Sequence, residues 1–383
     1  MRCPFCQARN PPGTRACSVC GGPVRGLHRL ASPPKQDAAS ATSTVPEPIS
    51  PLISFEEVPP AEPELVARRA RENGAPRIVS ALFWAAETDF YPLFVLENGQ
   101  LQRWDVSGDE LHLFPWRRRF RQPSSVSAAA LSPERALLAT GHESGQVRLQ
   151  RLEPGFGRAP WKARAVETIE AHRGCVLSLA AAQTRLYSAG SDGTVVLTSL
   201  TDAPGTDANR SEVILEGFSA LSCLAVSPDG RWLALGADDG QVQMWRLGED
   251  GTPARLDWTS GQDQSRVKSL KLSPNGHMLL SRNARGAECL WAAQSGHRLP
   301  GTAAPNSPLA SVFAADSRLL ASADASGQCL LFDAWTGRLR HTLPPLSGEV
   351  QALAFAPANE SGARETLLIV TGAREIVAWK VSF

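Results

Sequence analysis

Short runs of alternating apolar and polar residues, separated by turn residues, fill the chain from about residue 76 to its end. The clearest example is LSCLAVSPDGRWLALGADDGQVQMWRL, over residues 221–247. Two turns divide this stretch: Ser-Pro-Asp-Gly at residues 227–230, and Asp239-Gly240, a dipeptide that favours tight β-hairpins. An apolar period of two predicts strands, and the frequent Gly and Pro residues disfavour helices. The stretch therefore predicts three consecutive antiparallel strands.

The same three-strand unit recurs along the chain. Its second turn has a glycine in six units and Arg374 in the seventh, and successive anchors are 41 to 48 residues apart. The six turn glycines are Gly99, Gly145, Gly193, Gly240, Gly286 and Gly327. Five residues after each anchor stands Trp104, Gln150, Thr198, Trp245, Trp291, Phe332 or Trp379. A period in the mid-forties with several short strands per unit predicts an all-β propeller of seven small sheets.

This repeat resembles the WD-repeat family over roughly residues 51–383. Trp104-Asp105 is the dipeptide that names the family, and Phe332-Asp333 is close to it. In the third unit, three residues match the family's hydrogen-bonded tetrad and a threonine replaces its tryptophan: His172, Ser188, Asp192 and Thr198. The resemblance implies a seven-bladed WD40-type β-propeller that docks protein partners.

Closing such a ring has a consequence for the last unit. The chain ends four residues after Trp379, which leaves three strands for the seventh sheet. We expect a fourth strand from upstream of the first unit to protect the open edge. Residues 52–58, LISFEEV, have strand composition and are the predicted closing strand. The following stretch is rich in helix formers and ends at an Asn-Gly stop signal, so we expect a short helix over residues 62–73.

Four of the eight cysteines lie in the first 20 residues, as Cys3, Cys6, Cys17 and Cys20. This Cys-x2-Cys-x10-Cys-x2-Cys spacing suits tetrahedral Zn²⁺, because each pair supplies two thiolates from one tight turn. The run resembles the short zinc ribbons, with Gln7 where they usually have glycine. We expect residues 1–23 to be a zinc ribbon with one structural ion, whose four sulfur ligands leave no position for water. Two disulfides or a redox centre are the alternatives.

Residues 24–50 are rich in Pro, Ala, Ser and Thr, and such a segment buries too little apolar surface to offset its ordering entropy. We expect a disordered linker that tethers the ribbon to the propeller. The other four cysteines stand in apolar runs and are predicted to be buried small side chains. They are Cys175, Cys223, Cys289 and Cys329.

Composition excludes several classes of protein. The 39 basic and 38 acidic residues give a formal charge of +1, which excludes a basic nucleic-acid coat and an acidic tail protein. No apolar run approaches the ~18 residues of a membrane span, and the N-terminus lacks a secretory signal, so we expect a cytoplasmic protein. The Ala- and Arg-rich composition and the ribbon type suggest a bacterial source. No P-loop, G-x-S-x-G, H-E-x-x-H or dinucleotide motif occurs, so no enzyme is predicted.

The sequence therefore predicts a non-enzymatic interaction scaffold. One propeller face would dock a protein or peptide, the propeller would be monomeric, and the zinc ribbon would be a tethered second contact module. The alternative is association with nucleic acid or the ribosome through the ribbon. The run WRRRFR at residues 116–121 mixes arginines with aromatics, as nucleic-acid surfaces do, but we interpret it as a charged outer strand.

Overall fold

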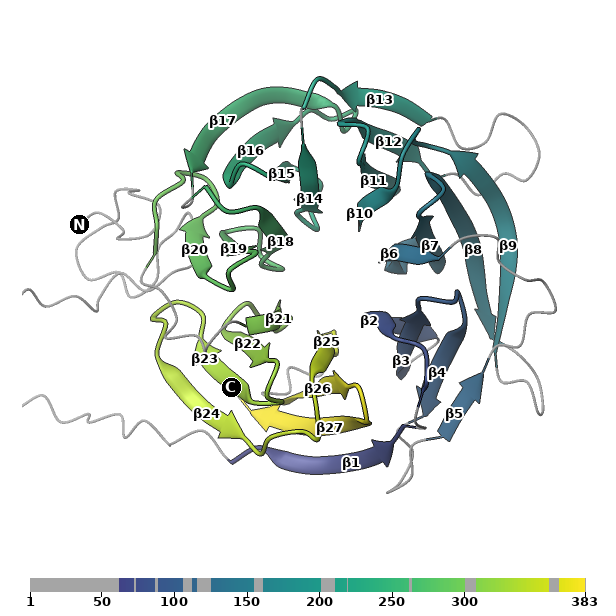
Figure 1. Ribbon diagram of the computed structural model, residues 1–383, viewed down its shortest axis with the longest axis vertical. Helices are drawn as coiled ribbons and strands as arrows, with labels where there is room; N and C mark the ends of the chain where they lie inside the picture. The colour runs from purple at the N-terminus through teal and green to yellow at the C-terminus, as the bar shows by residue number, and fades with distance from the viewer. Residues whose placement is uncertain are drawn as a thin grey trace, which may run out of the picture. The chain divides into compact units, whose positions relative to one another are not determined.

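The computed structural model shows a ring of small antiparallel sheets (Figure 1). It describes residues 62–71, 74–86, 89–105, 112–115, 125–154, 161–200, 211–218, 220–261, 264–299, 308–357 and 365–382. The chain divides into two units, Met1–Ala61 and Glu62–Phe383, and every described residue belongs to the second. Four predicted segments lie outside the described residues: the zinc ribbon (1–23), the linker (24–50), the strand at 52–58 and the basic run at 116–121.

Seven sheets, here called blades, form the ring. Blade 1 contains β2 (Ile78–Ala86), β3 (Asp89–Leu96), β4 (Leu101–Asp105) and β5 (His112–Pro115). Blade 2 contains β6 (Val126–Ser132), β7 (Leu137–His142), β8 (Gln146–Pro154) and β9 (Trp161–Glu170), with a 3-10 helix at Pro133–Arg135. Blade 3 contains β10 (Val176–Ala182), β11 (Arg185–Gly190), β12 (Val195–Ser199) and β13 (Ser211–Leu215).

The remaining blades repeat this order. Blade 4 contains β14 (Leu221–Val226), β15 (Trp232–Ala237), β16 (Gln241–Leu247) and β17 (Pro253–Gly261). Blade 5 contains β18 (Val267–Leu272), β19 (Met278–Asn283) and β20 (Glu288–Ala292). Blade 6 contains β21 (Pro308–Phe313), β22 (Leu319–Asp324), β23 (Cys329–Asp333) and β24 (Leu339–Leu343). Blade 7 contains β25 (Val350–Phe355), β26 (Glu365–Gly372), β27 (Glu375–Ser382) and β1 (Glu64–Ala70).

The innermost strands of the blades surround the centre of the ring (Figure 1), and they are β2, β6, β10, β14, β18, β21 and β25. The predicted seven-bladed, all-β architecture is therefore confirmed. The six predicted turn glycines all have positive φ, as tight hairpin turns require. They connect the second and third strands of their blades, where the repeat placed them.

Ring closure follows the predicted principle but uses different residues. The fourth strand of blade 7 is β1, which pairs antiparallel with β27 from Glu64↔Lys380 to Ala70↔Glu375. The helix predicted over residues 62–73 is therefore wrong, and β1 holds the place predicted for residues 52–58. Helix propensity is worth only tenths of a kcal/mol per residue, so pairing with the free edge of β27 outweighs it.

Every innermost strand has a register shift after its first residue, so the same β-bulge recurs in all seven blades. In two blades the extra residue is a serine that bonds to the next blade. Oγ of Ser127 donates to the backbone O of Val176 at 2.5 Å, and Oγ of Ser222 donates to that of Val267 at 2.6 Å. The bulges thus help to hold neighbouring blades together.

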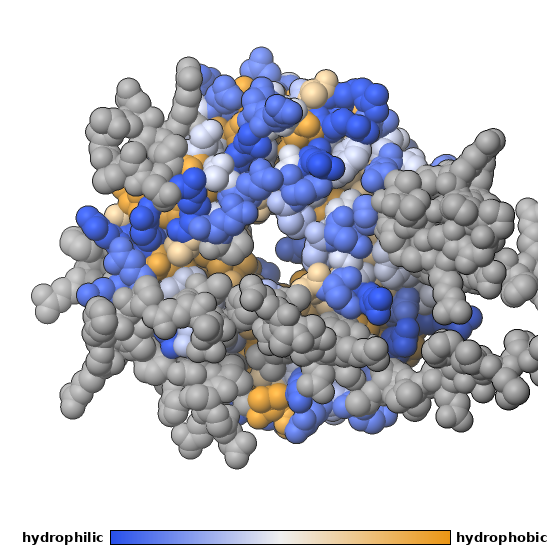
Figure 2. Space-filling view, turned by 180° about the vertical axis from the view of Figure 1, so that it is seen from behind, coloured by the Kyte–Doolittle hydropathy of each residue, from blue (hydrophilic) through white to orange (hydrophobic). Residues whose placement is uncertain are grey.

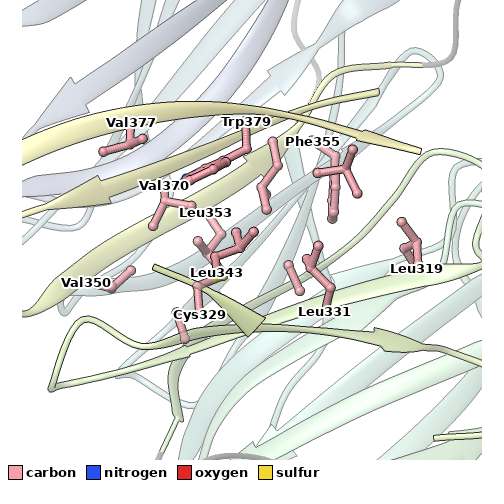
Figure 3. Close-up of a cluster of buried hydrophobic side chains, with 14 of the residues drawn as sticks. Leu319, Cys329, Leu331, Leu343, Val350, Leu353, Phe355, Val370, Val377 and Trp379 are labelled. Atoms are coloured by element: carbon pink, nitrogen blue, oxygen red, sulfur yellow. The ribbon is translucent and has the colours of Figure 1, made fainter. Parts of the chain in front are cut away.

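Among the described residues, apolar clusters join six pairs of neighbouring blades. Figure 3 shows the cluster between blades 6 and 7, where Leu331 and Leu343 lie opposite Phe355, Val370 and Trp379. Similar clusters join blades 7 and 1, 1 and 2, 2 and 3, 3 and 4, and 4 and 5. Burial of these side chains, at roughly 25 cal/mol per Å² of apolar area, is the main force that keeps the ring rigid.

Candidate functional site

A cavity of about 580 Å³ occupies the central channel of the ring, and all seven innermost strands contribute to its wall. Figure 2 shows the opening at the centre of the ring. The volume falls in the range of ~300–1,000 Å³ that is typical of ligand sites. Because each blade repeats the same strand order, the innermost strands run in the same direction, and their C-terminal ends share one mouth of the channel.

We call this end of the channel the C-terminal mouth. Its wall is formed by large apolar side chains near the ends of the innermost strands, and we call them the apolar rim. The rim residues are Phe83, Leu131, Val226, Leu272, Val312 and Phe355. Nearer the start of the strands, the wall includes the polar side chains of Ser80, Ser269 and Gln351. The channel is therefore apolar at one mouth and more polar further in.

Among the described residues of the channel wall, two are charged, and both are cations of blade 5: Lys271 on β18 and Arg282 on β19. The wall residues that the structure describes include no Asp, Glu, His or Cys. The Lys271 side chain is open to the channel, yet the ring surrounds it. This loss of bulk solvent lowers the pKa of Lys271, and the nearby Arg282 lowers it further. Lys271 thus brings to the channel a positive charge that no carboxylate in the described wall neutralises, whereas Arg282 is attracted to Glu288, which lies outside that wall.

Arg282 also belongs to a polar cluster at the junction of blades 5 and 6. Its Nη1 donates to the backbone O of Pro308 at 2.8 Å. Glu288 accepts hydrogen bonds from Oγ of Ser311 and, at 3.3 Å, from Oγ of Ser322. Burial raises the pKa of Glu288 and lowers that of Arg282, and the attraction between the two groups opposes both shifts. Nε of Arg282 is buried and has no hydrogen-bond partner within the described part of the chain.

The residues that resemble the family's tetrad do come together in blade 3. Nε2 of His172 lies 2.8 Å from Oγ of Ser188, and its Nδ1 lies 3.2 Å from Oδ1 of Asp192 and 3.0 Å from Oγ1 of Thr194. Burial lowers the pKa of His172, although Asp192 opposes this shift. The ring is enclosed and every ring nitrogen is hydrogen-bonded. This network therefore stabilises the blade and offers no open site for a substrate.

The predicted zinc ligands, Cys3, Cys6, Cys17 and Cys20, lie outside the described residues. Among the residues that are described, no group of three or more His, Cys, Asp or Glu side chains is placed to hold a metal ion.

The scattered cysteines were predicted to be buried, and Cys223, Cys289 and Cys329 are, while Cys175 is partly exposed. Burial raises the pKa of both Cys223 and Cys329 to about 12, so these thiols stay protonated.

Sequence reasoning missed the two channel cations. Lys268 and Lys271 both lie in the strand sequence VKSLKL, and lysines in a strand usually mark its solvent face. One signal was present: β18 is the first strand of its repeat unit, and first strands of a propeller line the channel. A lysine in that strand was therefore a candidate for the channel wall.

Comparison with known proteins agrees with this architecture. Residues 210–246 match the WD40 family, described as WD domain, G-beta repeat. The match runs from β13 of blade 3 through β14 and β15 into β16 of blade 4, so one sequence repeat spans two blades. Within the described residues, no helix has the length and apolar character needed to cross a membrane.

A curated relative matches half of the chain. Over 200 residues the chain is 27% identical to periodic tryptophan protein 2 homolog of Dictyostelium discoideum, which covers 51% of this chain. The chain spans 20% of that relative's length. Fold and comparisons together describe a seven-bladed β-propeller with a WD40-type repeat.

Proposed function

We propose that this chain is a non-enzymatic interaction scaffold whose propeller docks a protein partner at the C-terminal mouth of the channel. The observation that supports this most directly is the composition of the channel wall. It combines an apolar rim with the cations Lys271 and Arg282, and its described residues include no Asp, Glu, His or Cys. Such a surface suits recognition rather than bond cleavage.

The zinc ribbon is a second, tethered contact module in this proposal. Four thiolates match the ligand set of a structural zinc site, so Cys3, Cys6, Cys17 and Cys20 would hold one Zn²⁺ and fold residues 1–23 around it. A flexible linker over residues 24–50 would allow the ribbon to reach about 25–30 Å. Binding of both modules to one assembly would raise the effective concentration of the second contact.

The test is site-specific photo-cross-linking of the full chain in its native cells. A photoreactive amino acid replaces Leu131 in the apolar rim, and a matched control replaces Val213, which is 55% exposed on the outer strand β13. We expect protein adducts from the rim position and few from the outer position, identified by mass spectrometry.

Two results would contradict this proposal. One is the absence of protein adducts at Leu131. The other is an association of the chain with nucleic acid that salt removes, because this would favour the ribosome or nucleic-acid alternative through the ribbon.

A further inference from the structure

The apolar rim and Lys271 lie close together at the C-terminal mouth, and Arg282 lies deeper in the channel, where it bonds to the first residue of β21. Leu272 is a rim residue and Lys271 directly precedes it on β18, while Arg282 pairs with Ser269 on the same strand. At about 3.3 Å per residue, both cations start within roughly 10 Å of the rim along the channel axis. A ligand that enters through this mouth therefore meets apolar side chains first and positive charge next.

The closed ring restricts which part of a partner can enter. β1 pairs with β27, so blade 7 has all four strands, and the innermost strands of blades 7 and 1 lie side by side. An internal peptide segment would have to enter and leave through a channel walled on all sides. The end of a chain can enter directly. Lys271 and Arg282 repel an N-terminal ammonium group and attract a C-terminal carboxylate.

We infer that the channel binds the C-terminal end of a partner protein, with the terminal carboxylate at Lys271 and Arg282 and the last apolar side chains against the rim. This inference rests on the proposed function, because it assigns a chemistry to the partner at the same site. Two observations carry it: Lys271 and Arg282 lie in a described wall that has no carboxylate, and the apolar rim lies before them. A carboxylate would make charge-assisted hydrogen bonds to both cations.

The test uses the purified full chain and two pools of synthetic hexapeptides whose final residues are drawn from Leu, Ile, Val and Phe. One pool ends in free carboxylates, and the other, otherwise identical, ends in carboxamides. Affinity selection followed by mass spectrometry measures which peptides the protein retains. We expect the free carboxylates to be retained at least about tenfold better than the carboxamides.

Charge reversal at one lysine provides the decisive comparison. Lys271→Glu should remove the preference for free carboxylates, because it places a negative charge beside the ligand's own. Lys268→Glu is the matched control: it makes the same charge change at an exposed residue of the same strand, outside the described channel wall, and should keep the preference. Thermal unfolding of both variants verifies that each is folded.

Equal retention of the two peptide pools by the wild-type chain would overturn the inference. So would a Lys271→Glu variant that selects free carboxylates as well as Lys268→Glu does. The proposed function fails separately: it is contradicted when the rim position Leu131 yields no protein adducts in cells. If the Lys271→Glu variant still gives the same protein adducts at Leu131, the chain is a scaffold but its ligand is not a C-terminal carboxylate.

Discussion

Gln351 of blade 7 accepts the backbone N–H of Ile78 in blade 1 at 2.9 Å, across 273 residues of sequence. The same Oε1 atom accepts Nη1 of Arg71 at 2.9 Å. Arg71 follows β1, and its guanidinium also donates to the backbone O atoms of Gly372 and Pro76. These bonds join the first blade, the last blade and the end of the closing strand, so side chains reinforce the closure that β1 provides.

Replacing this acceptor should loosen the ring. Gln351→Leu leaves the N–H of Ile78 and the guanidinium of Arg71 without their shared acceptor, so we expect a loss of about 2 kcal/mol of stability. The denaturant midpoint measures the loss. Gln241→Leu, the same change at an exposed position of β16, is the control. Equal midpoints for the two variants would contradict a role for Gln351 in closure.

Disrupting β1 should expose the edge of β27. Adjacent N–H groups of a strand point to opposite sides, so one of Arg68 and Arg69 donates its N–H toward β27. Replacing both residues with proline therefore removes one hydrogen bond between β1 and β27. We expect a lower unfolding temperature and soluble aggregates in size-exclusion chromatography. A control with prolines at Leu52 and Ile53 should behave as wild type if β1 alone closes the ring. A monomeric, equally heat-stable β1 variant would show that closure does not depend on this strand.

Alanine substitutions at Gly145 and Gly74 distinguish two causes of lost stability: a steric clash of the new Cβ, and the strain of a positive φ in a residue other than glycine. Both have positive φ, but a Cβ on Gly145 would lie 2.1 Å from the backbone O of His172, whereas a Cβ on Gly74 would meet nothing within 4 Å. We expect Gly74→Ala to cost about 1 kcal/mol and Gly145→Ala about 3 kcal/mol or more. Chemical denaturation of both variants measures the difference. Similar losses would mean that the turn moves freely away from His172.

The His172 network should make stability depend on pH. Burial lowers the pKa of His172 below its ordinary 6.5, so the unfolded chain binds the proton more readily. The contribution of neutral His172 to stability is therefore fully present above about pH 6.5. It is lost as the pH falls toward the pKa of His172 in the folded protein. We expect His172→Gln to lower stability at pH 7.5 by about 1–2 kcal/mol and to flatten the decline below pH 6.5. The exposed His297→Gln is the control, and an unchanged slope in His172→Gln would refute the assignment.

The zinc prediction has a direct elemental readout. We expect the purified full chain to contain one Zn²⁺, and the variant with Cys17→Ser and Cys20→Ser to contain none, because two thiolates cannot retain a structural ion. The propeller should unfold at the same temperature in both proteins, since its described core contains none of these cysteines. Metal analysis that finds no zinc in the wild-type chain would refute the ribbon.

Local patterns predicted much of the fold, because a repeat of strands and hairpin turns is encoded within each unit. The period of 41 to 48 residues predicted seven blades, and the turn glycines were found where the period placed them. The network of His172, Ser188 and Asp192 was also predicted, from the resemblance to the WD-repeat tetrad, and it joins the loop before β10 to β11 and to the turn after β11. These features depend on contacts between residues that are near one another in the sequence.

The sequence by itself determined the strands, the turns, the number of blades and the need for a closing strand. The tertiary structure decided which segment closes the ring, because pairing of β1 with β27 joins residues about 300 positions apart and outweighs the helix propensity of ELVARRA. It also decided that Lys271 faces the channel while Lys268 lies outside its described wall. Two lysines of one strand become chemically different only when seven strands are brought around a common axis.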